Sequence, residues 1–79
     1  MSSVQQRVKK VIAQVLKITE DQISDDANFI FDLGADSMQS MELVAAFEEE
    51  FDIEMDEEKA LEVQTVSHAV TFISEYLNK

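Results

Sequence analysis

The residue types best suited to chemistry in this 79-residue chain lie together at positions 32–38. Gly34 falls where the chain must turn sharply, and glycine adopts a positive φ without steric cost. Asp36, followed three residues later by Gln39, has the pattern of a capping box, in which the first residue accepts a backbone N–H of the first helical turn. With Asp36 as the cap, Ser37 becomes the first helical residue. We therefore expect the Ser37 hydroxyl to be free and to point into solvent.

A serine at this place suits a phosphoryl group. The N-terminus of a helix presents unpaired N–H groups and a partial positive charge, and both favour a phosphodiester. The neighbouring Asp36 is repulsive unless a divalent cation or a basic partner lies between the charges. Residue types and spacing thus predict a serine fit for modification, and they leave the modification open.

Apolar residues at helical spacing predict three main helices that position this serine. The first covers about residues 3–16 and opens with a serine–glutamine capping box. The second runs from near Ser37 to near Phe51, and the last covers about residues 66–77 behind the cap Thr65. Because the chain has one glycine and no proline, we expect an all-α fold.

Two stretches of the chain lack this helical spacing of apolar residues. Residues 18–35 are rich in Asp, Ser and Asn, which compete with helix, and they predict a long ordered loop. We expect three apolar side chains of this loop to face the core: Ile23, Phe29 and Leu33. Residues 56–58 could begin a short helix, followed by packing of Leu61 and Val63. The prediction is an all-α four-helix bundle with three main helices, a short third helix and a long first loop, in a single domain over residues 1–79.

The charge is strongly acidic and unevenly placed. The chain has 17 acidic and 6 basic residues, and its net charge is -11. The first 19 residues contain no acid and four bases: Arg7, Lys9, Lys10 and Lys17. A surface this acidic repels phosphate backbones, so we expect no nucleic-acid partner and instead attraction to basic patches on proteins. No apolar run approaches the roughly 20 residues of a membrane span, and the polar start and lack of cysteine indicate a cytoplasmic protein.

The residues do not match two other functions, a serine hydrolase and a calcium sensor. A serine hydrolase would need Ser37 with His68 and an acid, but residues 34–38 do not form G-x-S-x-G, and we expect a core too small for a pocket. A calcium sensor would need a glycine at the sixth loop position and a glutamate at the twelfth; in the loop that starts at Asp52 these are Glu57 and Val63. We therefore predict no catalytic residue, no metal site and no enzymatic activity.

Residues 32–38, Asp-Leu-Gly-Ala-Asp-Ser-Met, closely resemble the acyl carrier protein motif D-L-G-A-D-S-L. The resemblance continues through residues 7–10, 42–44, 48–52 and 65–66, and it covers nearly the whole chain. It is closest to the bacterial type II carriers. The resemblance implies that Ser37 receives a 4′-phosphopantetheine arm from coenzyme A. It also implies that acyl groups are bound to this arm as thioesters for fatty-acid or related lipid biosynthesis, and that the helices shield the acyl chain.

The resemblance also implies partners. They are holo-acyl-carrier-protein synthase, acyltransferases and ketosynthases, which would dock a monomeric carrier through basic patches. The cluster of glutamates at positions 48–50 lies near a helix C-terminus, where negative charge is unfavourable, and this placement favours a docking role. The expected docking residues lie at the start of the second helix and along it: Asp36, Met38, Met41, Glu42, Glu48 and Glu49.

Four positions depart from the family pattern. Met38 replaces leucine, Gln39 replaces an acid, Asp56 stands in place of proline, and Phe31 stands where a polar residue is common. Phe31 could touch the arm, the acyl chain or a partner, and such changes suggest a specialised carrier. Two alternatives stay open: a peptidyl or polyketide-type carrier, and an acidic adaptor protein that is never modified.

Overall fold

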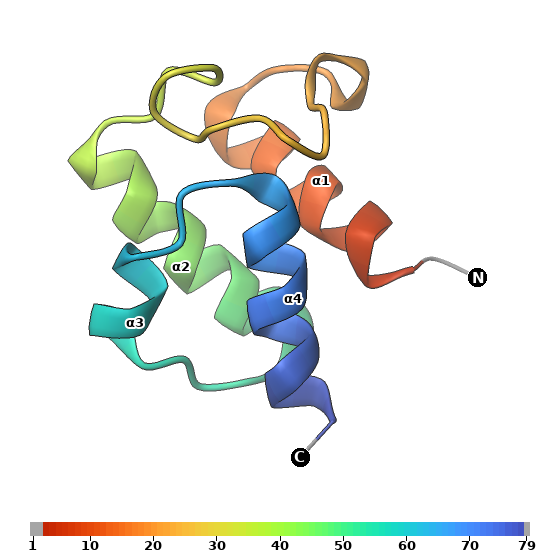
Figure 1. Cartoon of the computed structure of the whole chain (residues 1–79), viewed down its shortest axis with the longest axis vertical. Helices are drawn as coiled ribbons and strands as arrows, with labels where there is room; N and C mark the ends of the chain where they lie inside the picture. The colour runs from red at the N-terminus through yellow and green to blue at the C-terminus, as the bar shows by residue number, and fades with distance from the viewer. Residues whose placement is uncertain (1–2, 79) are drawn as a thin grey trace.

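The computed structural model describes residues 3–78. Four α-helices and one 3₁₀ turn follow each other along the chain, as Figure 1 shows: α1 (Val4–Leu16), η1 (Glu20–Gln22), α2 (Ser37–Phe51), α3 (Glu57–Leu61) and α4 (Val66–Leu77). The described residues contain one isolated antiparallel bridge, between Asn28 and Thr65, and no longer strand. The predicted bundle of three main helices and a short third one is confirmed, while η1 was not predicted. No described helix has the length and apolar character that crossing a membrane requires.

The helix ends follow from local side-chain caps. Ser3 accepts from the backbone N–H of Gln6, and the Gln6 side chain accepts from the backbone N–H of Ser3, which is the predicted capping box. Thr65 caps α4 by accepting from the backbone N–H of His68. α1 ends at Lys17, which takes a left-handed conformation with φ 58°, a conformation that glycine adopts at lower cost.

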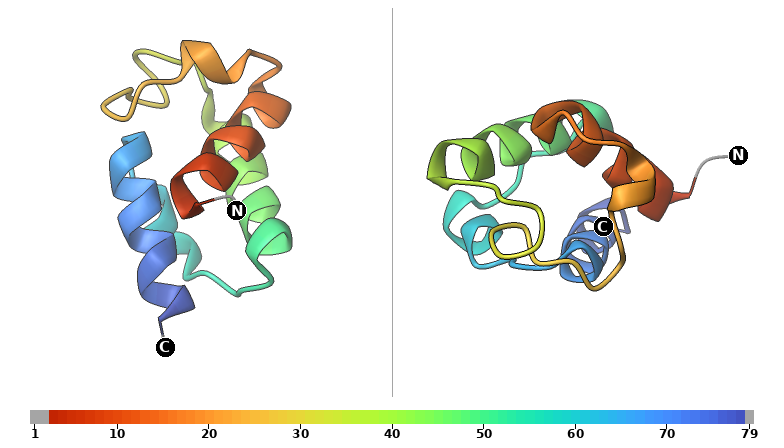
Figure 2. Two further views of the ribbon diagram at one scale, coloured as in Figure 1. Left: turned by 90° about the vertical axis from the view of Figure 1, so that its right-hand side faces the viewer. Right: turned by 90° about the horizontal axis from the view of Figure 1, so that it is seen from above.

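The core lies between α1, α2 and α4. α1 packs against both of the other long helices, and the views in Figure 2 show the three arranged around a common interior. The largest side chains with no measurable exposure come from α1 and α4: Val8, Ile12, Val66 and Ile73. From α2, Leu43, Phe47 and Phe51 complete the core at the predicted four-residue spacing.

The long first loop is packed onto this core. Ile23 and Phe29 are buried, and Leu33 is partly buried against the core, so the predicted inward positions are confirmed. Backbone hydrogen bonds attach the loop to the segment before α4, where Phe29 N donates to Gln64 O over 2.9 Å and Val66 N donates to Ala27 O over 3.1 Å. The loop therefore closes one end of the bundle, as Figure 2 shows.

The short third helix depends on Asp56. Its side chain accepts from the backbone N–H groups of Glu58 and Lys59, and its own N–H donates to the Tyr76 hydroxyl over 2.9 Å. Aspartate is thus a functional N-cap at the position where the resemblance led us to expect proline. The expected packing of Leu61 is wrong: its side chain is 50% exposed, because α3 turns Ala60 toward the interior and the next residue lies about 100° around the helix.

Candidate functional site

The start of α2 has the predicted cap. Asp36 has extended backbone angles, φ -97° and ψ -176°, and its Oδ1 accepts from Gln39 N over 2.8 Å. Asp36 N donates to Gln39 Oε1 over 3.2 Å, which completes the capping box. The carboxylate of Asp36 therefore satisfies the helix end without help from the next residue.

Ser37 is the first residue of α2, and its side chain is exposed. Within the described part of the chain its hydroxyl takes part in no hydrogen bond, and the backbone N–H groups of Ser37 and Met38 have no protein acceptor. A free hydroxyl thus stands beside two free N–H donors at the positive end of a four-turn helix. This arrangement suits a phosphodiester on Ser37 Oγ.

A ring of hydrogen bonds in the loop sets the direction from which the chain enters α2. Asn28 Oδ1 accepts from the N–H groups of Ile30 and Phe31, and Asn28 N donates to Asp32 Oδ2 over 2.7 Å. The Asn28 carbonyl accepts from Asp32 N, which closes the ring. The sequence predicts side-chain bonds from Asn28 to the backbone, and this prediction is confirmed; the pairing of Asn28 with Asp32 was not predicted.

The chain then folds back on itself just before Ser37. Gly34 N donates to Ile30 O over 3.1 Å, and Ala35 N donates to Phe29 O over 2.8 Å. Gly34 has φ 75°, as its place in the turn predicted, and an added Cβ would meet no atom within 4 Å. A substitution there is therefore opposed by backbone strain and not by crowding.

On its far side the loop is tied to α1 through Asp25. The Lys9 ammonium lies 2.8 Å from Asp25 Oδ1, and the Gln5 amide donates to the same oxygen. The hydrogen bonds from Lys9 and then Gln5 lower the pKa of Asp25 below its ordinary value of 3.8. The backbone carbonyl of Asp25 accepts from Ser67 N over 2.9 Å, so one residue joins the loop, α1 and α4.

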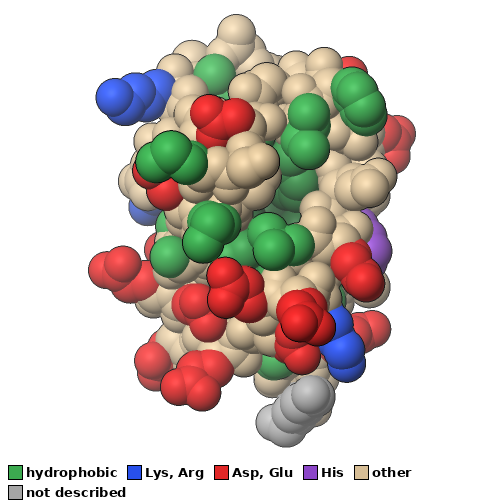
Figure 3. All heavy atoms as spheres, turned by 90° about the vertical axis from the view of Figure 1, so that its left-hand side faces the viewer, with side chains coloured by type: hydrophobic (Ala, Val, Ile, Leu, Met, Phe, Trp, Pro, Cys, Tyr) green, Lys and Arg blue, Asp and Glu red, His purple; other side chains and the backbone are tan. Residues whose placement is uncertain are grey.

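Apolar side chains stay in solvent around Ser37. Met38 is 73% exposed and Met41 is 55% exposed on α2, and Ile30 and Leu61 are also exposed. Figure 3 shows hydrophobic side chains gathered around a hollow on this face, with acidic side chains below them. The exposure of Ile30 and Leu61 was not predicted from the sequence. For Ile30 the run Phe-Ile-Phe at residues 29–31 was an available signal, because one loop cannot bury three successive large side chains.

The hollow continues into an apolar cavity of about 110 Å³ between α2, α3 and α4. Leu43, Val44 and Phe47 line it from α2, and Ala69, Phe72 and Ile73 line it from α4. Ser40, one turn after Ser37 on α2, also borders it, so the cavity begins on the side of the helix that carries Ser37. The expectation that so small a core leaves no room for a pocket is wrong, because the short α3 covers α2 and α4 incompletely.

The four acidic residues in the expected docking set have different surroundings. Asp36 and Glu42 are exposed at and near the start of α2, and Glu49 is exposed near its end. Glu48 is only partly exposed, and its Oε2 accepts from Met55 N over 2.9 Å. Its carboxylate therefore holds the α2–α3 connection, which is a structural role that the sequence did not indicate.

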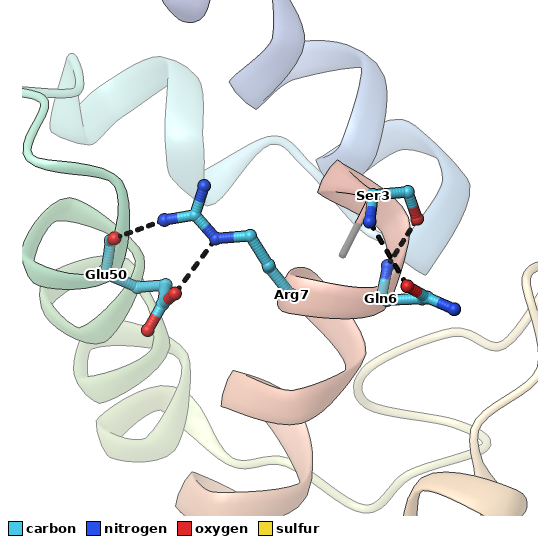
Figure 4. A network of polar contacts seen from close by, with 4 residues as sticks. All are labelled: Ser3, Gln6, Arg7 and Glu50. Carbon is cyan, nitrogen blue, oxygen red and sulfur yellow. Dashed lines mark hydrogen bonds and ion pairs between the residues drawn. The ribbon is translucent and has the colours of Figure 1, made fainter. Parts of the chain in front are cut away.

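Glu50 also has a structural role. Arg7 Nε lies 3.0 Å from Glu50 Oε2, and Arg7 Nη2 donates to Glu50 O over 2.7 Å, as Figure 4 shows. The guanidinium carbon lies 4.3 Å from the centre of the Phe51 ring. Glu48 and Glu50 therefore stabilise the fold, and only Glu49 keeps the unfavourable placement that favoured a docking role.

The residues of the two rejected functions are not assembled. His68 is exposed in the first turn of α4, where its backbone N–H is bound by the cap Thr65. Residues 3–78 contain no group of three or more His, Cys, Asp or Glu side chains placed to hold a metal ion.

Comparison with known proteins identifies the class of this site. The family model described as a phosphopantetheine attachment site matches residues 6–73. A solved structure of a proposed acyl carrier protein from Mycobacterium tuberculosis is similar over 94% of this chain and 99% of its own, with a TM-score of 0.85 and 26% sequence identity. The chain belongs to the phosphopantetheine-attachment family of carrier proteins.

Membership settles several expectations. The protein is a carrier of the acyl carrier type and not an enzyme, and its cofactor is a covalently attached 4′-phosphopantetheine. The predicted family, fold and cofactor are confirmed. The residues around Ser37 fit this group, since a solvent-exposed hydroxyl and two free N–H donors meet at one helix end.

Proposed function

We propose that Ser37 carries the 4′-phosphopantetheine arm and that the protein transports acyl intermediates for fatty-acid or related lipid biosynthesis in the cytoplasm. The observation that carries the proposal is the division of roles at the start of α2. Asp36 caps the helix, so the Ser37 hydroxyl is free for a phosphodiester. When bound, the arm supplies a terminal thiol that holds the acyl group as a thioester.

The cavity favours an alkyl cargo. Its wall is built almost wholly from aliphatic and aromatic side chains, and a polar aminoacyl group would lose its hydration there without gaining partners. A volume of about 110 Å³ is smaller than the roughly 150 Å³ cavity that encloses benzene. Short acyl chains therefore fit with little rearrangement, which supports the fatty-acid assignment over a peptidyl carrier.

The docking surface is proposed at the start and along the exposed side of α2. Asp36 and Glu42 supply negative charge, and Met38 and Met41 supply apolar contact area. Glu49 extends the negative charge toward the end of the helix. The Glu48 carboxylate already accepts a hydrogen bond from Met55 N, so Glu48 attracts a partner through its charge more than through direct contact. Holo-acyl-carrier-protein synthase, acyltransferases and ketosynthases with basic patches are the partners that such a monomer would attract.

Intact-mass spectrometry tests the attachment site. Wild-type protein is incubated with coenzyme A, Mg²⁺ and a holo-acyl-carrier-protein synthase beside the Ser37→Ala and Ser40→Ala variants. We expect one added phosphopantetheine on the wild type and on Ser40→Ala, and none on Ser37→Ala. An arm on Ser37→Ala would refute the proposed site, and an unmodified wild type would favour the adaptor alternative.

Melting of loaded forms tests the cargo. A butyryl arm that enters the cavity removes apolar surface from water, so it should raise the melting temperature above that of the free arm. A glycyl arm of similar length serves as the matched polar cargo and should produce no rise. Equal melting temperatures for the two cargoes would remove the support for an alkyl carrier.

Charge reversal tests the docking surface. Glu42→Lys should lower the synthase kcat/KM severalfold, because it places a cation where a basic patch must approach. Glu75→Lys, an equal charge change at an exposed position of α4, is the control and should have a smaller effect. Equal losses in the two variants would show that net charge matters and that this face of α2 does not.

A further inference from the structure

Phe31 is the most exposed large apolar side chain among residues 3–78. Its side chain is 86% exposed, more than Met38 at 73% or Ile30 at 56%. Its neighbour Phe29 is buried, so the ring of Phe31 is not needed by the core. A phenylalanine held in water gains nothing for stability, and an exposed apolar cluster that surrounds a functional residue marks an interaction surface.

The backbone under Phe31 is firmly held. Phe31 N donates to Asn28 Oδ1 over 3.0 Å, and Ile30 N donates to the same oxygen over 2.9 Å. The next residue, Asp32, is bound to Asn28 through both its backbone and its side chain. Because the loop is already ordered, it loses little conformational entropy when a partner binds the Phe31 ring. A side chain held in this way is a pre-organised anchor.

The fold brings this loop beside the modified serine. The hydrogen bonds from Gly34 to Ile30 and from Ala35 to Phe29 reverse the chain next to Ser37. The three Cα–Cα steps from Gly34 to Ser37 span at most about 11 Å. A standard protein contact covers roughly 800 Å² per partner, a disc of about 16 Å radius. An enzyme whose active site touches Ser37 Oγ therefore covers this loop, whereas a partner that meets only the far end of the arm need not.

The charges around the ring indicate the chemistry of that enzyme. Asp32 and Asp36 are exposed on the same loop, and Glu42 follows one turn into α2 beyond Met38. The described bases nearest in sequence are Lys17 before the loop and Lys59 after α2. A complementary surface thus has an apolar depression for the ring and basic side chains around it.

Resting on the proposed function of Ser37, we propose that Phe31 is an anchor for the enzyme that attaches the arm, and that this enzyme receives the ring in an apolar socket rimmed by basic residues. Phe31 acts as a specificity residue: it binds the modifying enzyme and takes no part in the transfer. Aromatic residues held rigidly in the centre of a contact are the usual sites of large binding energy.

The first measurement is of binding without transfer. In the Ser37→Ala background no arm can form, so the affinity for a purified holo-acyl-carrier-protein synthase with coenzyme A reports docking alone. Adding Phe31→Ala should weaken this affinity roughly tenfold, within the range for interface anchors. Leu77→Ala is the matched control, since Leu77 is another exposed apolar residue and is the last residue of α4. The C-terminal end of α4 lies at the opposite end of the molecule from the long first loop (Figure 1). Leu77→Ala should leave the affinity unchanged.

The second measurement is of transfer. With Ser37 present, Phe31→Ala should raise KM roughly tenfold and leave kcat within about twofold, because an anchor contributes binding and not chemistry. The melting temperature should stay the same, since the side chain is exposed. The affinity ratio between wild type and Phe31→Ala should also persist at high salt, because an apolar contact is not screened.

The outcomes separate the two proposals. A wild type that is never modified overturns the function proposed for Ser37. A wild type that is modified, with equal affinity in Phe31→Ala, overturns the anchor alone. Equal docking of the Ser37→Ala forms combined with slower transfer by Phe31→Ala would assign the ring to the arm and also overturn the anchor. Binding to phosphatidylcholine vesicles that requires Phe31, with unchanged affinity for the synthase, would assign the ring to a lipid surface and refute the proposal.

Discussion

Removing the guanidinium of Arg7 should destabilise the protein by about 1 to 2 kcal/mol. Arg7→Met keeps most of the aliphatic stem and deletes three interactions of the guanidinium. They are the ion pair with the Glu50 carboxylate and the hydrogen bond to Glu50 O, both drawn in Figure 4, and the contact with the Phe51 ring. The ion pair with Glu50 is more than a third exposed on both sides, so solvent limits it to about 0–1 kcal/mol. The contact with the Phe51 ring contributes about 0.5–1 kcal/mol.

The third interaction is the hydrogen bond from Arg7 Nη2 to Glu50 O. This carbonyl is among the last four of α2, which have no partner within their own helix. A charged donor at a helix C-terminus also meets the negative end of the helix dipole, so the bond contributes about 1 kcal/mol at an exposed site. Because one guanidinium makes all three contacts, the sum of the upper values overstates the loss, and about 1 to 2 kcal/mol is expected.

Urea unfolding followed by circular dichroism measures this loss. The series contains wild type, Arg7→Met, Glu50→Gln and the double variant, and Lys10→Met serves as a control with the same change in charge at an exposed side chain. We expect Glu50→Gln to cost less than Arg7→Met, because it leaves the carbonyl bond and the ring contact in place. The double variant should resemble Arg7→Met.

Two results would refute this reasoning. If Arg7→Met and Lys10→Met lose equal stability, then the loss reflects net charge and the three contacts contribute nothing. If Glu50→Gln lowers the free energy of unfolding as much as Arg7→Met does, the ion pair accounts for the whole loss. The hydrogen bond to Glu50 O then contributes nothing to stability. For a domain of this size, a loss of 1 kcal/mol corresponds to about 4–8 °C in melting temperature, so either outcome is easily resolved.

Three further predictions concern the core, the helix cap and pH. Phe47→Ala should cost about 3 to 5 kcal/mol, since this side chain is 4% exposed; a loss below 1 kcal/mol in urea unfolding would contradict its central place. Asp36→Ala should cost about 1 kcal/mol through loss of the cap, whereas Asp36→Asn retains a capping oxygen and should lose synthase affinity with little stability; the reverse pattern would contradict both roles. Since the folded-state pKa of Asp25 lies below its ordinary value of 3.8, its stabilisation is present above that value and is lost as pH falls through the folded-state pKa. The stability difference between wild type and Asp25→Asn, measured by urea unfolding, should therefore vanish in strong acid, and a constant difference would exclude the contact with Lys9.

The helices and their caps were predictable because their causes are local. The serine–glutamine and aspartate–glutamine boxes act over three residues, and the apolar spacing of α4 is regular enough to define its face without tertiary information. The same holds for Ser37, whose exposure follows from Asp36 being the cap. The geometry of the proposed attachment residue was thus predictable from the sequence.

What the sequence did not reveal depends on contacts between distant residues. Arg7 and Glu50 are 43 positions apart, and Asp56 meets Tyr76 across 20 positions. The cavity arises from how a five-residue α3 sits over α2 and α4, which no local pattern encodes. Leu61 was misassigned for the same reason, because a helix of this length lacks the turns that would define its buried face.

The uneven charge also has a mechanical consequence. α1 carries Lys10 and, at its end, Lys17, both exposed, while the exposed acids lie mostly on α2 and the segments after it. The molecule is therefore an electrical dipole as well as an anion. A positively charged enzyme exerts a torque on such a body at distances of about one Debye length, roughly 8 Å at physiological salt, and turns the acidic side that carries α2 and α3 toward itself before the surfaces touch.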